Sequence, residues 1–390
     1  MISVEVALGH LFELVAPLEK EEVPLLEAAG RVLAEPVLAA RDQPPFAASA
    51  MDGYAARASD VHEGAELSVI GEAAAGHAFE GQLGHQEAVR IFTGAPVPDG
   101  ADIVVLQEDV DRSETSITIT DRHKVENWIR PAGGDFQAGH LIDAPRMLRS
   151  ADVALLAAMN IATVHVHRAP VVALISTGDE LVMPGEAPGP DQIVASNSFG
   201  LAALLRDLGA IPRLLPIARD SKAALNTVFD LATGADIIVT IGGASVGDHD
   251  LVGSVAADRG LDRSFYKVAM RPGKPLMAGR MGDAVLLGLP GNPVSAMVCG
   301  HVFLTPMIHR LQGLEAAPRL RRTARLAVPM PPNGPREHYM RATLKTGELT
   351  PDSRQDSSLL SVLAGANALL IRPPKDPARE RGALVDYLPL

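Results

Sequence analysis

The stretch from Ala235 to Asp250 constrains the fold of this chain more than any other segment. Its apolar, β-branched run from Ile237 to Ile241 predicts a buried strand. The loop that follows carries a Gly-Gly pair, a serine and two aspartates: Gly242, Gly243, Ser245, Asp248 and Asp250. Paired glycines let the chain turn sharply and bring backbone N–H groups close to a ligand. Because ligands of an open parallel α/β sheet bind outside the carboxyl ends of its strands, we expect this loop to border a ligand site.

Two later segments have features that suit an anion. The segment YKVAMRPGKP carries three cations, and its Pro-Gly pair predicts a rigid turn that orients the last two: Lys267, Arg271 and Lys274. A second segment places a Pro-Gly-Asn-Pro sequence at the start of a predicted helix: Pro290, Gly291, Asn292 and Pro293. Free backbone N–H groups at such a start favour anion binding over a plain helix start. Carboxylates and cations on neighbouring loops suit a phosphate-bearing ligand together with a metal or a second oxyanion.

Three other motifs each admit a second interpretation. The motif STGDEL begins at Ser176, turns at Gly178 and exposes Glu180, so it is either a site loop or an acidic turn device. The motifs SAMDGYA, with Asp52, and FTGAPVP, with Thr93, are ordinary turn sequences when each is taken alone. The sequence has neither a P-loop nor a G-x-G-x-x-G fingerprint, so the common nucleotide-binding folds are not expected.

Charge and cysteine content exclude several classes of protein. The formal net charge is −12, which argues against a general nucleic-acid binder because phosphate backbones demand a basic surface. Cys299 is the only cysteine, so an intrachain disulfide and a cysteine-based zinc site are excluded. No basic-then-apolar leader and no membrane-length apolar run is evident, so we expect a cytoplasmic protein with no membrane partner.

Local patterns divide the chain into segments of different character. Residues 4–34 carry apolar positions at helical spacing, which predicts two helices broken near Pro24. Residues 54–130 alternate short apolar runs with Gly, Pro and Asp turns, which predicts a small β domain, and residues 337–390 predict another. Between residues 170 and 311 predicted strands and helices alternate, which indicates a parallel, doubly wound sheet.

The motifs SAMDGYA, FTGAPVP, STGDEL, GGASVGDHD, KVAMRPGKP and GLPGNPVSA, in this order and at these intervals, resemble the molybdopterin molybdenumtransferase family. This is the MoeA type, related to the E domain of gephyrin, and the resemblance covers essentially the whole chain. It implies a multidomain α/β plus β protein with a central doubly wound parallel α/β ligand domain at 169–316. An elongated mixed domain is expected at 1–45 and 135–168, an inserted β domain at 46–134 and a C-terminal β barrel at 317–390.

The resemblance also implies an activity and a set of site residues. The family inserts molybdenum from molybdate into adenylated molybdopterin with Mg²⁺ and release of AMP, the last common step of molybdenum cofactor biosynthesis. Catalytic roles are implied for Asp52, Thr93, Glu180, Asp220 and Asp250, with Asp135 also functionally important. The implied Mg²⁺ ligands are Asp220, Asp248 and Asp250. The implied pterin and phosphate contacts are Ser176, Gly242, Gly243, Ser245, Lys267, Arg271, Lys274, Pro290, Gly291, Asn292 and Pro293. Molybdate is expected near Thr93, Ser176 and Ser245.

Two departures from the family pattern bear on these expectations. Arg271 stands where family members often have lysine, so a planar guanidinium replaces a compact ammonium. Gly134 stands where an acidic residue commonly precedes Asp135.

The resemblance further implies a homodimer whose active site is shared across subunits, with molybdopterin adenylyltransferase and molybdoenzyme chaperones as further partners. Two alternatives compete with the insertion activity: molybdopterin adenylyltransferase, which the 170–311 region also resembles, and a non-enzymatic pterin carrier or scaffold. The N-terminal motifs favour insertion over adenylyl transfer, and the intact acidic motif residues favour an enzyme over a scaffold.

Overall fold

The computed structural model describes residues 1–120, 126–243 and 251–390. Its central sheet has six strands in the order β18-β15-β19-β23-β22-β20. They are β15 (Val171–Ser176), β18 (Ile211–Leu214), β19 (Ile237–Ile241), β20 (Asp262–Tyr266), β22 (Met277–Met281) and β23 (Ala284–Leu289). The strands β18, β15, β19 and β23 are mutually parallel, as predicted, whereas β22 runs antiparallel to both of its neighbours. The chain leaves β15 for β18 on one side and returns to β19 on the other, which creates a topological switch point between β15 and β19.

Helices cover both faces of this sheet because alternate strand residues point to opposite sides. Val172 and Leu174 of β15 join one hydrophobic core, while Ala173 and Ile175 join the other. The first core is covered by α1 (Val4–Leu14), α3 (Asn197–Asp207), α6 (Pro293–Cys299) and α7 (Thr305–Leu311), with a π-helical turn at Gly300–Leu304 between the last two. The second core is covered by α4 (Lys222–Leu231) and α5 (Leu251–Asp258). The doubly wound fold is thereby confirmed.

The N-terminal segment differs from its prediction. Helix α1 forms as expected and is capped by Ser3, whose hydroxyl accepts a hydrogen bond from the Val6 N–H at 3.1 Å. Its apolar face packs into the core of the α/β sheet. The second predicted helix is wrong: a strand, β1 (Lys20–Pro24), is followed by a single 3₁₀ turn in which Leu26 is 96% exposed. Leu26 therefore supplies no buried face that would favour a longer helix.

An arm of mixed structure extends from the α/β sheet. Its sheet runs in the order β1-β14-β2-β13, with helix α2 beside it and the pair β3–β12 beyond. These elements are β2 (Val32–Leu33), β3 (Val37–Leu38), β12 (Leu141–Ile142), β13 (Arg146–Met147), α2 (Ser150–Ala158) and β14 (Thr163–His167). Arg168 fixes the arm to the sheet by donating to both carboxylate oxygens of Asp236, at 2.8 and 2.6 Å.

The arm carries the inserted β domain at its far end. A short pair, β4 (Ala48–Ser49) and β11 (Ile129–Arg130), connects the two. The domain is one six-stranded sheet in the order β8-β5-β7-β6-β10-β9. Its strands are β5 (Gly53–Ala56), β6 (Glu66–Ala73), β7 (Glu87–Ile91), β8 (Ile103–Leu106), β9 (Val110–Arg112) and β10 (Ser116–Ile119).

The C-terminal residues form a closed five-stranded barrel. Its order is β25-β26-β24-β28-β27, and pairing of β27 with β25 closes it. The elements are β24 (Arg322–Leu326), β25 (Glu337–Lys345), β26 (Glu348–Pro351), α8 (Leu360–Gly365), β27 (Ala368–Arg372) and β28 (Leu384–Pro389). Strand β21 (Met270–Arg271) leaves the α/β domain and pairs with β25, which ties the two domains together.

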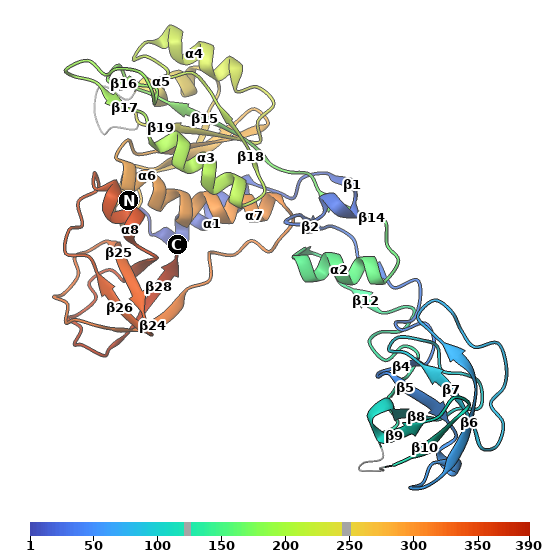
Figure 1. The fold of residues 1–390 in the computed structure, drawn as a ribbon. Helices are drawn as coiled ribbons and strands as arrows, with labels where there is room; N and C mark the ends of the chain where they lie inside the picture. Colours follow the sequence, from blue (N-terminus) through green and yellow to red (C-terminus); the bar gives the residue numbers. More distant parts are fainter. Residues whose placement is uncertain (121–125, 244–250) are drawn as a thin grey trace.

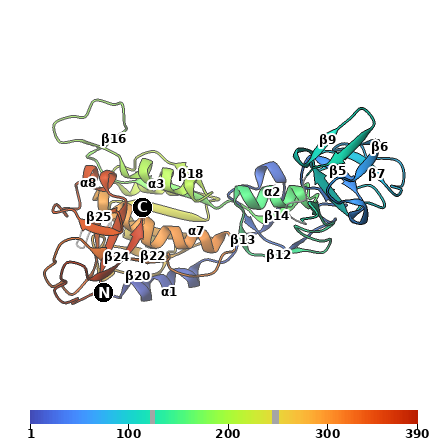
Figure 2. The ribbon, with the colours of Figure 1, turned by 60° about the horizontal axis from the view of Figure 1, so that its bottom comes forward.

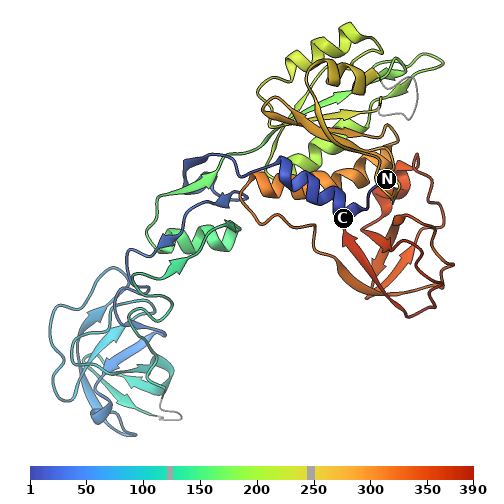
Figure 3. The same cartoon turned by 180° about the vertical axis from the view of Figure 1, so that it is seen from behind.

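The whole chain is strongly elongated. The α/β domain and the barrel lie together at one end, and the inserted β domain lies at the other end of the arm (Figure 1). The same separation is seen from two other directions (Figures 2 and 3). Both chain termini lie at the end that holds the α/β domain and the barrel. Over the parts of the chain that the structure describes, no helix is long and apolar enough to cross a membrane.

Candidate active site

A large cavity lies at the carboxyl edge of the central sheet, where the sequence placed a ligand site. Its volume is about 1160 Å³, and it opens where β15, β19 and β23 end, next to the switch point. It contains nine of the predicted site residues: Ser176, Glu180, Asp220, Gly242, Gly243, Pro290, Gly291, Asn292 and Pro293. Residues 244–250 are outside the described part of the chain, so the predicted residues Ser245, Asp248 and Asp250 are not placed.

The two glycines after β19 are required by their surroundings. Gly242 has φ +94° and Gly243 has φ +65°, a region that favours glycine. A Cβ at Gly242 would lie 2.9 Å from the carbonyl oxygen of Thr177, and one at Gly243 would lie 2.4 Å from Cγ2 of Val252. The wall of the cavity is therefore closely packed against the backbone of both glycines.

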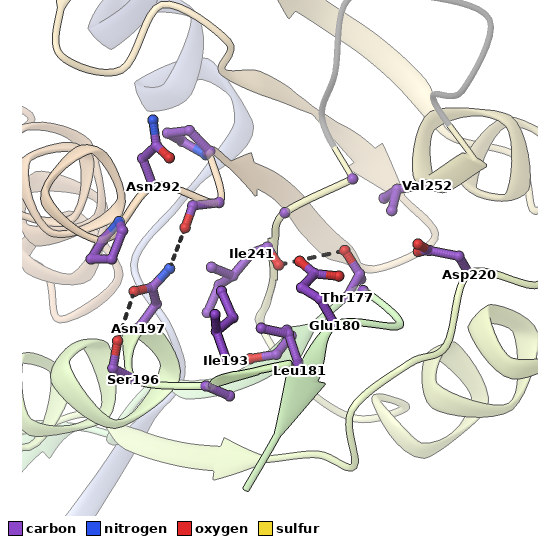
Figure 4. Close-up of a pocket in the computed structure, with 18 of the residues that line it drawn as sticks. Thr177, Glu180, Leu181, Ile193, Ser196, Asn197, Asp220, Ile241, Val252 and Asn292 are labelled. Atoms are coloured by element: carbon purple, nitrogen blue, oxygen red, sulfur yellow. Dashed lines mark hydrogen bonds between the residues drawn. The ribbon is translucent and has the colours of Figure 1, made fainter. Parts of the chain in front are cut away.

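One end of the cavity is lined by amides and hydroxyls. Asn197, at the start of α3, donates from its side chain to the carbonyl oxygen of Gly291 at 2.7 Å (Figure 4). Asn292 donates to the Ser357 hydroxyl at 2.9 Å, and the backbone N–H of Val294 donates to the Ser357 carbonyl at 3.0 Å. The predicted free helix start is thus partly wrong, because a segment of the C-terminal barrel already occupies one of the first N–H groups of α6.

The other end of the cavity is acidic. Gly178 has φ +144°, and the Glu180 carboxylate folds back over it, so that a Cβ at Gly178 would lie 2.2 Å from Oε2 of Glu180. Asp220 lines the cavity just before α4, and its backbone N–H donates to Asp179 at 3.1 Å. Arg219 braces the turn by donating to the carbonyls of Asp179 and Leu181, at 2.9 and 3.0 Å. In Figure 4 the Glu180 and Asp220 side chains lie on either side of Thr177.

Four helices begin around this cavity. Asn197, Lys222 and Pro293 line it and are the first residues of α3, α4 and α6, and Leu251, the first described residue of α5, lines it as well. The partial positive charge at helix starts favours anions, which offsets the acidity of Glu180 and Asp220. The cavity is therefore suited to a ligand that carries phosphates.

The acidic end fits a hard cation such as Mg²⁺. Carboxylate oxygens are its preferred protein ligands, and it commonly takes only one or two of them together with water and substrate phosphate. Asp220 and Glu180 supply such oxygens on neighbouring turns. No group of three acidic, histidine or cysteine side chains suited to a metal occurs within residues 1–120, 126–243 and 251–390, so a site here would rest on few protein ligands.

The three predicted cations do not line the cavity, although Pro275 beside them does. Lys267 lies with its ammonium 5.2 Å from the centre of the Tyr266 ring, and Arg271 and Lys274 are exposed. Arg271 lies on β21, which pairs with β25 of the barrel.

Arg271 instead belongs to a cationic cluster between the α/β domain and the barrel. Burial, followed by the charges of Arg271, Arg341, Arg336 and Arg372, lowers the pKa of His338 to about 4. Arg341 is fully buried, and its Nη2 donates to the carbonyl oxygen of Asp356 at 2.9 Å. Its Nε and Nη1 have no hydrogen-bond partner within the described residues. A buried guanidinium with free N–H groups is suited to an oxyanion.

The remaining predicted residues lie far from this cavity in the same chain. Asp52 and Thr93 meet in the inserted β domain, where the Thr93 N–H and hydroxyl both donate to one Asp52 oxygen at 2.7 Å. These two bonds, with the charge of Arg90, lower the pKa of Asp52. Asp135 is exposed on the arm. A Cβ at Gly134 would lie 3.0 Å from the Pro131 carbonyl oxygen, so the usual acidic residue would crowd this turn.

Comparison with known proteins identifies the family. Models of the MoeA N-terminal region (domain I and II), a probable molybdopterin-binding domain and the MoeA C-terminal region (domain IV) match residues 2–160, 173–310 and 323–390. The molybdopterin molybdenumtransferase of Nostoc sp. is 40% identical over 328 residues, which cover 80% of this chain and 75% of the relative. The chain belongs to the molybdopterin molybdenumtransferase family.

Two further relatives support this membership. Molybdopterin molybdenumtransferase 2 of Mycobacterium tuberculosis is 38% identical over 366 residues, which cover 90% of each chain. The crystal structure of a molybdopterin biosynthesis MoeA protein from Pyrococcus horikoshii matches with a TM-score of 0.84 and 27% identity, over 100% of both chains. As a member of the molybdopterin molybdenumtransferase family, the chain is a transferase enzyme.

Sequence reasoning missed several residues that line the site of this family member. They include Thr177, Ser196, Asn197, Lys222, Ser254 and Ser358. Ser196 and Asn197 had a usable signal, because polar residues ahead of an apolar run such as FGLAALL mark a helix start. Ser358 had none, since only the folded chain brings the barrel to the α/β cavity.

Proposed function

We propose that this enzyme inserts molybdenum from molybdate into adenylated molybdopterin and releases AMP. The observation that carries the proposal is the large cavity at the switch point, with helix starts for phosphates at one end and carboxylates for a cation at the other. Relatives that carry the name molybdopterin molybdenumtransferase support the insertion of molybdenum.

The adenylated pterin is bound in this cavity. Its phosphates lie against the backbone of Gly242 and Gly243 and the starts of α3 and α6, where N–H groups and aligned dipoles favour negative charge. Lys267 and Lys274 lie on the neighbouring segment and attract the anionic ligand. Asp220 and Glu180 would hold Mg²⁺ with the help of Asp248 and Asp250, and the ion would supply positive charge beside the phosphoanhydride.

Molybdate binds the cluster of Arg271, Arg341 and His338. It is a dianion, so the carboxylates of the cavity repel it, whereas the free N–H groups of Arg341 are buried and need an acceptor. Arg341 donates to the carbonyl of Asp356, two residues before Ser358 of the cavity wall, so the cluster adjoins the pterin site. This position differs from the one expected near Thr93, Ser176 and Ser245.

The complete site includes residues of two subunits in a homodimer. Asp52 and Thr93 lie at the far end of the arm from the cavity of their own chain (Figure 1). A twofold dimer that brings the inserted β domain of one subunit to the cavity of the other makes two such composite sites.

The N-terminal and C-terminal matches support insertion over adenylyl transfer. The adenylyltransferase alternative needs only the α/β domain, but this chain also matches the MoeA regions on both sides of it. The cavity with its carboxylates supports an enzyme over a scaffold.

The test is release of AMP from adenylated molybdopterin with and without molybdate in the presence of Mg²⁺. We expect release only when molybdate is present. Asp220→Asn should lower the rate about 100-fold with little change in pterin binding, since charge stabilisation in the transition state is lost. Asp207→Asn, an exposed carboxylate at the far end of α3, is the matched control. Molybdate-independent release, or equal loss of binding and rate in Asp220→Asn, contradicts the proposal.

A further inference from the structure

The joint between the arm and the α/β domain has no apolar core of its own. The buried apolar residues of the arm form one cluster, and none of the described residues in that cluster belongs to either core of the α/β domain. Domains joined without a large apolar interface move relative to each other unless other contacts hold them. The angle at which the arm leaves the α/β domain therefore depends on the polar contacts at the joint.

One side chain, Arg168, connects the parts of this joint. It lies between β14 of the arm and β15 of the sheet, where the chain leaves the arm. Its backbone N–H donates to the Glu19 carbonyl oxygen at 2.9 Å and its Nε donates to the Glu19 carboxylate at 2.7 Å, where the chain enters the arm. Its two terminal nitrogens donate to the two carboxylate oxygens of Asp236, directly before β19. Arg168 thus holds both chain connections of the arm to the central sheet.

The Asp236 end of this contact is firmly fixed in the sheet. Its carboxylate is only 13% exposed and accepts a further hydrogen bond from the Val171 N–H at 2.7 Å. Its backbone N–H donates to the Val171 carbonyl oxygen at 2.8 Å, and its carbonyl oxygen accepts from the Val285 N–H at 3.0 Å. Asp236 is thereby bound to β15 and β23, on either side of β19. A planar guanidinium that makes two parallel hydrogen bonds to a fixed carboxylate is constrained in direction as well as in distance.

Other contacts at the joint are single hydrogen bonds. The Leu18 N–H donates to the carbonyl oxygen of Leu311 at 2.8 Å, and Nδ1 of His167 donates to the Leu18 carbonyl oxygen at 2.7 Å. A single bond tolerates a change of angle better than a bidentate pair does. The arm carries the inserted β domain at its far end, so a small rotation at the joint displaces this domain further than it displaces the base of the arm (Figure 2).

We propose that Arg168 is a positioning residue for the transfer reaction, because it holds the arm at the angle that brings the inserted β domain of one subunit to the cavity of the other. The inference rests on the proposed function, in which Asp52 and Thr93 act at the cavity of the second subunit. Arg168 acts only through the arm, since Asp236 lies at the amino edge of the central sheet and the cavity lies at its carboxyl edge.

The test removes the bidentate contact and measures the angle of the arm directly. Arg168→Met keeps the apolar stem and loses the guanidinium, whereas Arg168→Lys keeps the charge but cannot form two parallel hydrogen bonds. Arg259→Met is the matched control, because Arg259 pairs with Asp230 inside the α/β domain and its side chain is 30% exposed, close to the 34% of Arg168.

Electron spin resonance distances between spin labels at Ala157→Cys, on α2 of the arm, and Leu231→Cys, on α4, report the angle. Both positions are exposed, and the native Cys299 is buried and stays unlabelled. Doubly labelled chains are diluted with unlabelled chains, so that the distance within one chain is measured. We expect one narrow distance in the parent and in Arg259→Met, a broad distribution in Arg168→Met and an intermediate one in Arg168→Lys.

The reaction should respond in a way that a loss of stability alone would not produce. In Arg168→Met the kcat of molybdate-dependent AMP release should fall about tenfold, since Asp52 and Thr93 reach the facing cavity in the right position less often. The KM for the adenylated pterin should stay as in the parent, because the cavity is intact.

An unchanged distance distribution in Arg168→Met overturns the proposal, as does a broadened distribution with the kcat of the parent, or an effect on KM alone. Failure of the unmodified protein to release AMP contradicts the proposed function instead. The distance measurement needs no ligand, so it still decides whether Arg168 sets the angle of the arm.

Discussion

The cavity of the α/β domain and the Asp52–Thr93 pair of the inserted β domain both arise from short turn motifs, yet they differ in completeness. The cavity is enclosed by the ends of three strands and by helix starts from a single chain. The pair is one hydrogen-bonded carboxylate on the surface of a small sheet. A carboxylate tied to its neighbour in this way is fixed in place, but it does not line the large cavity of its own chain.

The cavity and the Asp52–Thr93 pair can therefore belong to one site only when a second chain brings its inserted β domain to the cavity of the first. A single chain holds them at opposite ends of the arm (Figure 3). Variants that change the two regions separately test whether they form one site.

The largest effect is expected from mixing two inactive chains. Asp52→Ala and Asp220→Ala should each abolish molybdate-dependent AMP release on their own, since each removes a carboxylate from both composite sites. In a heterodimer one site carries both lesions and the other is intact, so co-expression should restore about half of the activity per dimer.

The control is co-expression of two differently tagged Asp220→Ala chains, which should remain inactive. Purified heterodimers without activity, or an active monomer in light scattering, would show that the two regions do not share a site.

A medium effect is expected from adding one methyl group in each region. Gly243→Ala should lower the free energy of unfolding by about 3 kcal/mol. Its φ of +65° is strained for alanine, and the new Cβ would lie 2.4 Å from a side-chain atom of Val252. Gly94→Ala, next to Thr93, should lower the free energy of unfolding by only about 1 kcal/mol. Its φ of +83° is also strained for alanine, but no atom lies within 4 Å of the new Cβ.

Urea unfolding measures both changes with separate signals. Trp128, the only tryptophan, reports the inserted β domain by fluorescence, while helical circular dichroism reports mainly the α/β domain. Equal costs at the two positions would mean that the cavity wall is no more tightly packed than the surface pair.

The smallest effect concerns the pKa of Asp52. Thr93→Val removes the hydroxyl but keeps the backbone N–H, which is the larger cause of the lowered pKa. The pKa should therefore rise but stay below its ordinary value. A carboxyl group whose pKa is lower in the folded than in the unfolded protein stabilises the fold at pH values above its unfolded-state pKa. This stabilisation is lost as the pH falls through the folded-state pKa.

The stability difference between the parent and Thr93→Val should accordingly be present at neutral pH and vanish in acid. Carboxyl ¹³C NMR titration measures the pKa, and Thr93→Ser should retain the parent value. An unchanged pKa in Thr93→Val would show that the hydroxyl does not contribute.

Much of the α/β domain could be predicted because its strands carry their own signal. The runs that became β15, β19 and β23 are continuous and apolar, as strands buried on both faces must be. The region of Leu25 and Leu26 misled the prediction, since helical spacing of apolar residues does not reveal that Leu26 stays exposed. Packing against the rest of the molecule decides such short segments.

The candidate site was predictable only where motif and location coincide. Gly242, Gly243 and Asp220 follow strands and line the cavity as expected. Arg341 could not be found, because the burial of its Nε and Nη1 without a hydrogen-bond partner among the described residues follows from the meeting of two domains distant in sequence. The position of Arg271 beside the barrel depends in the same way on the pairing of β21 with β25.

The pairing of β4 with β11 has a consequence for how such a gene can change. Because the two strands lie side by side, the polypeptide enters and leaves the inserted β domain at neighbouring points. A gene segment that encodes this domain can be gained, lost or exchanged as a unit. When the domain is lost, a short hairpin turn can join β4 directly to β11. Two neighbouring chain connections also resist twisting better than a single one, so an exchanged domain would keep its orientation relative to the arm.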